Sequence, residues 1–367
     1  MRMTRRTALG LAASTAGTAL IGGAAPGPTS AKAAGFRMPL ESDRHQRTFM
    51  QWPARKTIYG SDRALAAVRE KIALIADTIA AFEPVVLLAR PEHIASARAA
   101  AGGGVDIWPI ETEDLWCRDS GPTFVVDAKG SQAASDLNFN GWGGKQTCRD
   151  DARIAGRVAA KLGLRVFNAG VVGEGGGVES DGAGTAMAHA SSWVNANRNA
   201  GTRADVERRL LAAVGAEKMI WAPGVAGADI TDYHIDALAR FVKPGQVLIQ
   251  LPDRPDPDDP WSLAAYDTYA VLKTARDARG RKLDIVVIPE PTDIRSRHDD
   301  FVSSYVNYYV CNGAVIGAQF GDSDADADAK RILEQLYPGR EVVSLNVDPI
   351  GEAGGGIHCA TQQQPAT

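Results

Sequence analysis

The sequence predicts an α/β fold. Segments in which apolar residues recur at three- and four-residue steps alternate with short runs rich in β-branched residues along the whole chain. The chain has 367 residues, of which 45% are hydrophobic and 23% charged. This composition provides for a large hydrophobic core and excludes a disordered or fibrous protein.

The first expected helix shows the pattern most clearly. Leu65, Val68 and Ile72 follow one another at helical spacing, Ser61 is placed to cap the helix, and Pro84 ends the segment. Further helices are expected near residues 151–162, 203–214, 262–279 and 325–336. Strands are expected at residues 85–88, 123–126, 247–251, 285–288, 303–309 and 342–343. Their roughly even spacing suggests a repeated strand–helix unit, and the Pro- and Asp-rich residues 252–260 are expected to form a surface loop.

Residues 1–33 are expected to be an export signal. Paired arginines, Arg5 and Arg6, precede a weakly apolar run that ends near Ile21, and Ala-Lys-Ala at residues 31–33 is typical of a cleavage site. The arginine pair and the Gly- and Thr-diluted run favour the twin-arginine route, so we expect the protein to be exported. No later stretch approaches the roughly 20 apolar residues that a membrane-spanning helix needs.

The charge distribution sets this N-terminal segment apart. The formal net charge is −4, although the first 33 residues carry four basic groups and no acidic one. Residues 34–367, which we expect to form a single domain, are therefore acidic. Such a surface disfavours nucleic acid or an anionic membrane as a partner and tolerates a cationic substrate.

The cysteines do not indicate a disulfide framework. Cys117, Cys148, Cys311 and Cys359 lie far apart and form no CxxC pair, so a disulfide is permitted by export but not required. Metal binding is not expected either. Zinc takes three or four ligands, whereas the closest His, Cys and Asp residues come only as pairs, namely His234 with Asp236 and His358 with Cys359.

Glycines and polar side chains concentrate in five segments, residues 114–122, 174–184, 231–236, 303–309 and 354–359. Each has a structural and a functional interpretation. Asp119 is either part of a structural ion pair or part of a functional site. Glu174 is either part of a turn or part of a functional site. His234 and Asp236 would face one ligand if their segment is a strand. Cys359 follows three glycines on a polar tail, and is a nucleophile or an inert thiol.

Taken together and in order, these segments resemble the agmatine deiminase family, which is grouped with the bacterial peptidylarginine deiminases. The resemblance spans nearly the whole chain after residue 37. Its motifs are Met50-Gln51-Trp52-Pro53, Trp116-Cys117-Arg118-Asp119-Ser120-Gly121-Pro122, Phe139-Asn140-Gly141-Trp142-Gly143-Gly144, Glu174-Gly175-Gly176, Asn195-Ala196-Asn197-Arg198-Asn199, Thr231-Asp232-Tyr233-His234-Ile235-Asp236, Ser304-Tyr305-Val306-Asn307, Gln319-Phe320-Gly321-Asp322 and Gly354-Gly355-Gly356-Ile357-His358-Cys359.

The resemblance implies a pentein fold, in which five ββαβ units surround a pseudo-fivefold axis with the active site in the central channel. It implies a guanidine hydrolase that needs no metal or organic cofactor and acts on a small cationic guanidine or an arginyl peptide. The implied roles are nucleophile for Cys359, general acid/base for His234, guanidinium-binding carboxylates for Asp119 and Asp236, orientation of the histidine for Glu174, and further substrate contacts for Trp116 and Asn307.

Residue chemistry is consistent with these roles. Two carboxylates can hold a planar guanidinium by charge-assisted hydrogen bonds, and a thiolate can attack its carbon. A nitrilase-type hydrolase would need a Glu–Lys–Cys set, and the glycine-rich segments contain no lysine. Because Cys359 and His234 are both present, a non-catalytic guanidine-binding protein is the third alternative.

Four positions depart from the agmatine-specific pattern. Ile230 replaces an acid expected near the far amine of agmatine, and Tyr233 replaces a glycine. Glu113 and Glu179 replace an asparagine and a histidine, and we expect these changed positions to lie at the far end of the substrate. Agmatine is therefore the first expected substrate and peptidyl or free arginine the second. The sequence does not predict an oligomeric state.

Overall fold

The computed structural model describes residues 29–367. The expected export signal lies outside the described residues up to position 28, so it stays a prediction. Within the described part, Ala31 is buried against Val125, Ala133 and Phe167, which shows that the packed structure already includes residue 31. None of the helices in residues 29–367 is long and apolar enough to cross a membrane.

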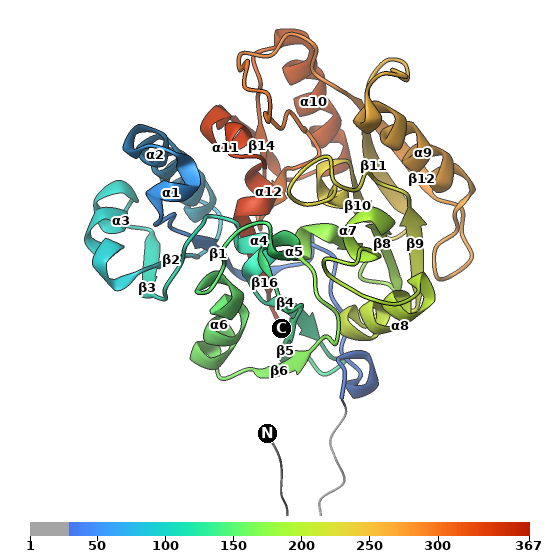
Figure 1. Ribbon diagram of the computed structural model, residues 1–367, viewed down its shortest axis with the longest axis horizontal. Coiled ribbons are helices and arrows are strands. Elements are labelled where there is room, and N and C mark those ends of the chain that lie inside the picture. The colour runs from blue at the N-terminus through green and yellow to red at the C-terminus, as the bar shows by residue number, and fades with distance from the viewer. Residues whose placement is uncertain (1–28) are drawn as a thin grey trace, which may run out of the picture.

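Five small sheets surround a central axis, and five longer helices lie around the outside (Figure 1). In each unit the first two strands are antiparallel, a helix follows, and the next strand returns parallel to the second. This is the ββαβ unit repeated five times, so the expected pentein fold is confirmed.

The strands group by sheet as follows. They are β16 (Thr361–Pro365), β1 (His45–Gln51), β2 (Val85–Ala89) and β3 (Val105–Pro109); β4 (Thr123–Val126), β5 (Gln132–Asp136) and β6 (Arg165–Asn168); β7 (Val178–Ser180), β8 (Thr185–His189) and β9 (Lys218–Ala222); β10 (Ala239–Lys243), β11 (Gln246–Leu251) and β12 (Asp284–Pro289); and β13 (Tyr309–Val310), β14 (Ala314–Ala318) and β15 (Glu341–Leu345).

The helices divide into long outer ones and short ones. The outer helices are α2 (Asp62–Ala80), α6 (Ile154–Leu162), α8 (Arg203–Val214), α9 (Pro260–Thr274) and α10 (Ser323–Leu336). The short ones are α1 (Lys56–Tyr59), α3 (Ile94–Ala100), α4 (Cys117–Ser120), α5 (Gly141–Gly144), α7 (Ala190–Trp193), α11 (Asp348–Glu352) and α12 (Ile357–Ala360), with 3-10 turns at Lys32–Ala34, Pro91–His93, Asp151–Arg153, Gly175–Gly177 and Ile235–Ala237.

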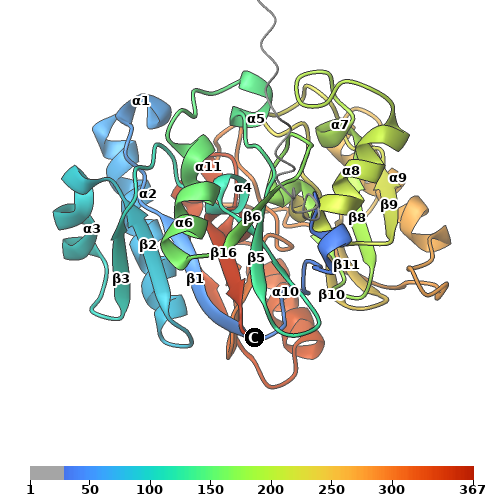
Figure 2. The ribbon, with the colours of Figure 1, turned by 90° about the horizontal axis from the view of Figure 1, so that it is seen from below.

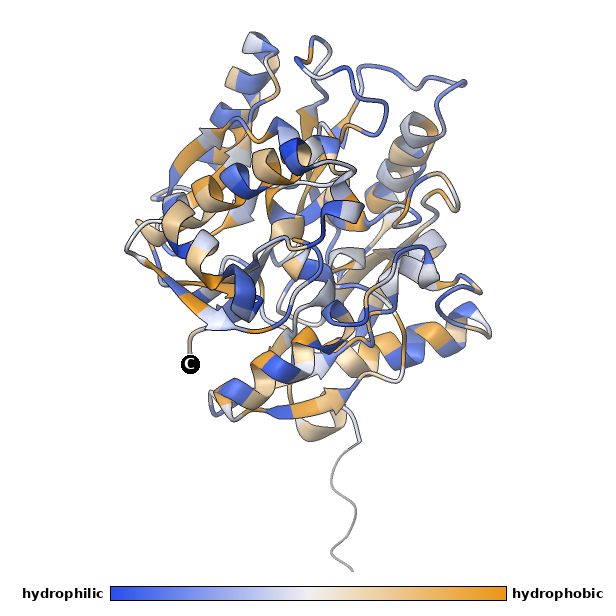
Figure 3. Cartoon of the chain, turned by 60° about the vertical axis from the view of Figure 1, so that its left-hand side comes forward, coloured by the Kyte–Doolittle hydropathy of each residue, from blue (hydrophilic) through white to orange (hydrophobic). Residues whose placement is uncertain are grey.

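The outer helices carry both apolar and polar residues (Figure 3), and most of the residues that they bury are apolar. In α2 the expected apolar stripe, which includes Leu65, Val68 and Ile72, is buried. The Ser61 side chain accepts a hydrogen bond from the Ala64 amide, as expected of a helix cap. Helix α8 has the expected bounds, whereas α9 ends at Thr274 because Ala275 is already extended.

The last strand closes the ring. β16 pairs antiparallel with β1, with Phe49 opposite Gln362, so the C-terminal strand completes the unit that the N-terminal part begins (Figure 2). The expectation that these residues form a polar tail is wrong. The strand is buried because its glutamines find partners inside the fold; Gln363, for example, accepts from Arg118 Nη1 at 2.8 Å.

The condition under which His234 and Asp236 would face one ligand as strand neighbours is not met, and the expected strand at residues 303–309 is wrong for all but its last residue. Residues 231–236 are not a strand, because Asp232 and Tyr233 adopt left-handed φ values of 59° and 66° and the chain then enters the 3-10 turn Ile235–Ala237. Of residues 303–309 only Tyr309 is in a strand, β13, because the preceding residues turn across the centre of the ring. The expected surface loop at 252–260 is confirmed, apart from Pro260, which begins α9.

Candidate active site

The candidate residues converge because each lies just before the first strand of its unit. Asp119 precedes β4, Glu174 precedes β7, His234 and Asp236 precede β10, and Cys359 precedes β16. Asn307 stands in the same place before β13. The short helices α4, α5 and α12 that carry or flank these residues lie at the centre of the ring (Figure 1). The repeated unit therefore explains how residues 240 positions apart reach one site.

Asp119 is held from two sides. Its Oδ2 accepts from the Trp142 indole Nε1 at 2.9 Å, and its Oδ1 accepts from the Gly176 amide at 3.1 Å. The Oδ1 atom also lies 3.7 Å from His234 Nδ1. All of these groups are buried, so the carboxylate has a fixed orientation.

Trp142 reaches Asp119 through an unusual turn. Residues 141–144 all have positive φ, including 54° at Trp142 itself. This conformation is unfavourable for residues other than glycine. Three of the four residues are glycines, and the Asn140 side chain accepts from the Gly143 amide at 2.7 Å to hold the turn. The strain at Trp142 is thus maintained by its neighbours and places the indole on a site carboxylate.

His234 lies within hydrogen-bond distance of Glu174, the residue that the resemblance expects to orient it. His234 Nε2 lies 3.1 Å from Glu174 Oε2, and Glu174 in turn accepts from Arg198 Nε at 2.9 and 3.0 Å. The same guanidinium donates through Nη1 to Asp232 at 2.6 Å and through Nη2 to the Thr231 carbonyl at 3.1 Å. Arg198 therefore fixes both the partner of His234 and the loop that precedes it.

Cys359 lies beside Asp236 and Asn307. Its Sγ is 3.6 Å from Asp236 Oδ2 and accepts from Asn307 Nδ2 at 3.2 Å, while its amide donates to Asn307 Oδ1 at 3.3 Å. The other oxygen of Asp236, Oδ1, is buried and has no hydrogen-bond partner among the described residues. It can accept an N–H group of a bound ligand.

Gly176 closes one side of the site. A β-carbon built on it would lie 2.8 Å from His234 Nδ1 and 2.9 Å from both Asp119 Oδ1 and Asp236 Oδ2. Three polar atoms of the site therefore converge on one point next to a glycine. Any side chain at this position would collide with them.

The charges of the site favour a cationic ligand. Burial raises the pKa of Asp119 to about 6; the nearby His234 opposes this rise, and Asp236 and Glu174 add to it. Burial alone would lower the pKa of His234, but Asp119 and Glu174 raise it to about 9, so the imidazolium persists at neutral pH. Burial together with Asp236 and Asp119 raises the pKa of Cys359 well above its ordinary value, so the resting residue is a thiol.

The structure therefore brings together Cys359, His234, Asp119, Asp236, Glu174 and Asn307. Trp116 is close to the group but contacts it indirectly, since its ring packs on Gly355 in the glycine run before Cys359. The sequence analysis assigned no role to Trp142, Gly176 or Arg198. Each belongs to a motif of the family resemblance, which was the signal available in the sequence.

Two of the four departures from the agmatine-specific pattern are structural. Glu113 pairs with Arg55 at 2.7 Å, and Glu179 pairs with Arg240 at 3.0 Å. Both carboxylates are buried in these pairs, so their interpretation as residues at the far end of the substrate is not supported. The φ of 66° explains why a glycine suits position 233, whereas Ile230 is exposed on the loop.

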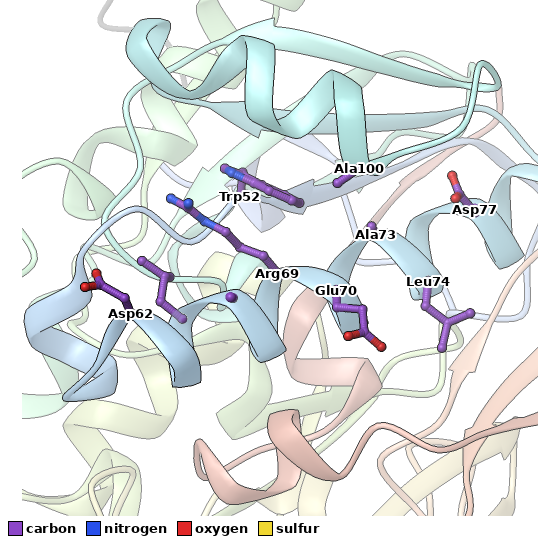
Figure 4. A pocket seen from close by; sticks show the side chains of 10 residues that line it. Trp52, Asp62, Arg69, Glu70, Ala73, Leu74, Asp77 and Ala100 are labelled. Carbon is purple, nitrogen blue, oxygen red and sulfur yellow. The ribbon is translucent and has the colours of Figure 1, made fainter.

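A surface groove lies away from these residues. It has a volume of about 640 Å³, follows α2 and is lined by side chains that include Trp52, Arg69, Glu70 and Asp77 (Figure 4). None of the candidate site residues lines it. Among residues 29–367 no group of three or more His, Cys, Asp or Glu side chains is arranged to hold a metal ion.

Comparisons with known proteins identify the family of this chain. The model of the Porphyromonas-type peptidyl-arginine deiminase family matches residues 37–365. The chain is 36% identical over 368 residues to the agmatine deiminase of Pseudomonas aeruginosa strain LESB58, covering 92% of this chain and 98% of that protein. It is 35% identical over 358 residues to the agmatine deiminase of Stutzerimonas stutzeri strain A1501, covering 90% and 96%.

A solved structure of the agmatine deiminase of Enterococcus faecalis matches with a TM-score of 0.85 at 26% identity, covering 92% of this chain and 98% of that one. The fold, the site at the centre of the ring and the sequence similarity lead to one conclusion. The chain belongs to the family of agmatine deiminases and Porphyromonas-type peptidyl-arginine deiminases, and it is a hydrolase that acts on guanidino C–N bonds.

Proposed function

We propose that this enzyme hydrolyses agmatine to N-carbamoylputrescine and ammonia, with Cys359 as the nucleophile. The observation that carries the proposal is the convergence of Asp119, Asp236 and His234 on one point beside Cys359. Two carboxylates on a planar cation fix its carbon for attack and match its charge. The relatives named agmatine deiminases support agmatine as the first substrate.

Binding of the guanidinium prepares the nucleophile. The cation lies next to the thiol and offsets the negative field of Asp119 and Asp236, so the thiol proton leaves to solvent and the thiolate forms. The Cys359 Sγ then attacks the guanidinium carbon and gives a neutral tetrahedral adduct. His234 donates its proton to one nitrogen, the C–N bond breaks, and ammonia leaves a positively charged S-alkylthiouronium.

Hydrolysis of this intermediate uses the same histidine in its neutral form. His234 takes a proton from water while the water oxygen attacks the thiouronium carbon. The C–S bond then breaks, the thiolate leaves, and the ureido product forms with loss of a proton. Glu174 keeps the His234 ring in place in both steps, and Asn307 Nδ2 donates to the sulfur.

The substrate is tested with purified enzyme and three guanidines: agmatine, free arginine and an arginyl peptide with blocked termini. We expect ammonia and ureido product from agmatine at a kcat/KM well above that of the other two. Preferred turnover of the peptide would place the enzyme with the peptidyl-arginine deiminases instead. Binding of a guanidine without any product would favour a non-catalytic binding protein.

The pH profile follows from two ionisations. Asp119 must be a carboxylate to bind the cation, so kcat/KM is expected to fall as the pH drops through about 6. His234 must be protonated to act as the acid, so kcat/KM is expected to fall as the pH rises through about 9. These limits belong to the coupled site, and kcat/KM measured from pH 5 to 10 at constant ionic strength checks them. A profile that is level across pH 6 would contradict the role of Asp119.

A further inference from the structure

His358 lies directly before the nucleophile and is bound on both sides of its ring. Its Nδ1 is 2.7 Å from Asp236 Oδ2, and its Nε2 is 2.8 Å from Glu41 Oε2. The ring is buried, as are both carboxylates. Since adjacent helical residues point about 100° apart, α12 can direct His358 toward Glu41 while Cys359 points into the site.

Glu41 is a rigid anchor for this ring. Its carboxylate accepts from Arg118 Nη2 at 3.0 Å and from the Val310 amide at 3.0 Å, and it pairs with Arg240 Nη2 at 2.8 Å. Burial opposes ionisation of Glu41, but Arg240, His358 and Arg118 lower its pKa well below the ordinary value. Glu41 is thus an anion that accepts and does not donate.

Asp236 is also an anion. Burial would raise the pKa of Asp236, but the hydrogen bond and charge of His358, with help from His234, lower it. Carboxylate oxygens thus face both ring nitrogens of His358, and the ring donates to both only when each nitrogen carries a hydrogen. The Asp236 oxygen that faces His358 is Oδ2, the same atom that lies 3.6 Å from Cys359 Sγ.

We propose that His358 is a positioning residue that donates to Asp236 Oδ2 and to Glu41 Oε2 together, and so holds this Asp236 oxygen beside Cys359 Sγ, where it meets the substrate guanidinium. This inference rests on the proposed deimination. His358 does not contact the reacting atoms; it acts through Asp236. The other charged groups around this pair, which contribute to its titration, are Glu41, Arg118, Asp119, Glu179, His234 and Arg240.

The test is the variant His358→Gln, compared with His45→Gln. His45 is also a buried histidine that faces a carboxylate, with Nδ1 3.1 Å from Glu83 Oε1, but it does not reach Asp236. In His358→Gln the carboxylate of Asp236 loses the histidine that lowers its pKa and stays buried near Asp119. We expect KM for agmatine to rise about tenfold, and the acid limb of kcat/KM to move up by about one pH unit and become steeper.

His45→Gln is expected to lower thermal stability without moving the acid limb. If His358→Gln also lowers only stability and its pH profile coincides with that of the wild type, His358 has a merely structural role and the proposal is overturned. The pH profile thus separates positioning from packing.

A second measurement keeps the proposal testable if His358→Gln does not fold. In wild-type protein labelled with ¹⁵N-histidine, NMR at pH 7 to 8 is expected to show hydrogen on both ring nitrogens of His358, assigned through its backbone amide. A ring with hydrogen on one nitrogen overturns the proposal. This measurement needs no turnover. If the enzyme does not hydrolyse agmatine, the proposed substrate is wrong, but the hydrogens on the His358 ring still test the role of His358.

Discussion

Replacement of Cys359 with serine is expected to lower kcat for agmatine by at least about 10⁴-fold. The alcohol of serine is far less acidic than a thiol. Burial, Asp236 and Asp119 raise the pKa of the Cys359 thiol, and the same surroundings disfavour an alkoxide still more. The change is small in volume, so we expect the variant to fold and to bind agmatine. Ammonia release under saturating agmatine measures the loss.

Cys148→Ser is the matched control. Cys148 is likewise partly buried, but burial with Asp151 and Glu113 raises its pKa to about 11, and it does not contact the site carboxylates. Its replacement is expected to leave kcat unchanged. Turnover by Cys359→Ser at the wild-type rate would exclude a covalent route through this residue.

Gly176→Ala is expected to lower kcat/KM by at least about 100-fold. The added methyl group would lie 2.8 to 2.9 Å from His234 Nδ1, Asp119 Oδ1 and Asp236 Oδ2, closer than carbon normally approaches such atoms. At least one of these groups must move from the position in which it holds the guanidinium or delivers a proton. The φ of Gly176 is not positive, so the cost is steric and falls on the site rather than on the backbone.

Gly156→Ala provides the comparison. Gly156 lies within α6, and no heavy atom is within 4 Å of the position that its β-carbon would take. Alanine there is expected to leave kcat/KM unchanged and to raise the free energy of unfolding by about 0.5–1 kcal/mol, because glycine is the poorer helix former. Steady-state kinetics and thermal unfolding of the two variants check both statements. Wild-type kinetics in Gly176→Ala would show that the three polar atoms do not converge on the substrate.

The outer parts of the fold are predictable because local patterns decide them. Ser61 caps α2, and the stripe that includes Leu65 and Val68 faces the sheets, since apolar spacing and capping act over a few residues. The errors fall near the centre of the ring. The strand expected at residues 303–309 is reduced to Tyr309, and residues 231–236 form a left-handed turn in which Asp232 accepts from Arg198, 34 positions away. A side chain so distant in sequence cannot be found by a local pattern.

Sequence motifs determined the family, the reaction type and the members of the candidate site. The residue types needed to bind and attack a guanidinium occur in short motifs that follow one another in a fixed order along the chain. Tertiary structure alone decided how they work together. It placed Trp142 on Asp119 and His358 on Asp236, and it showed that Glu179 pairs with Arg240. The physical reason is that hydrogen bonds and charge interactions depend on distance in space, and the ring brings Asp236 and His358, 122 positions apart, to 2.7 Å.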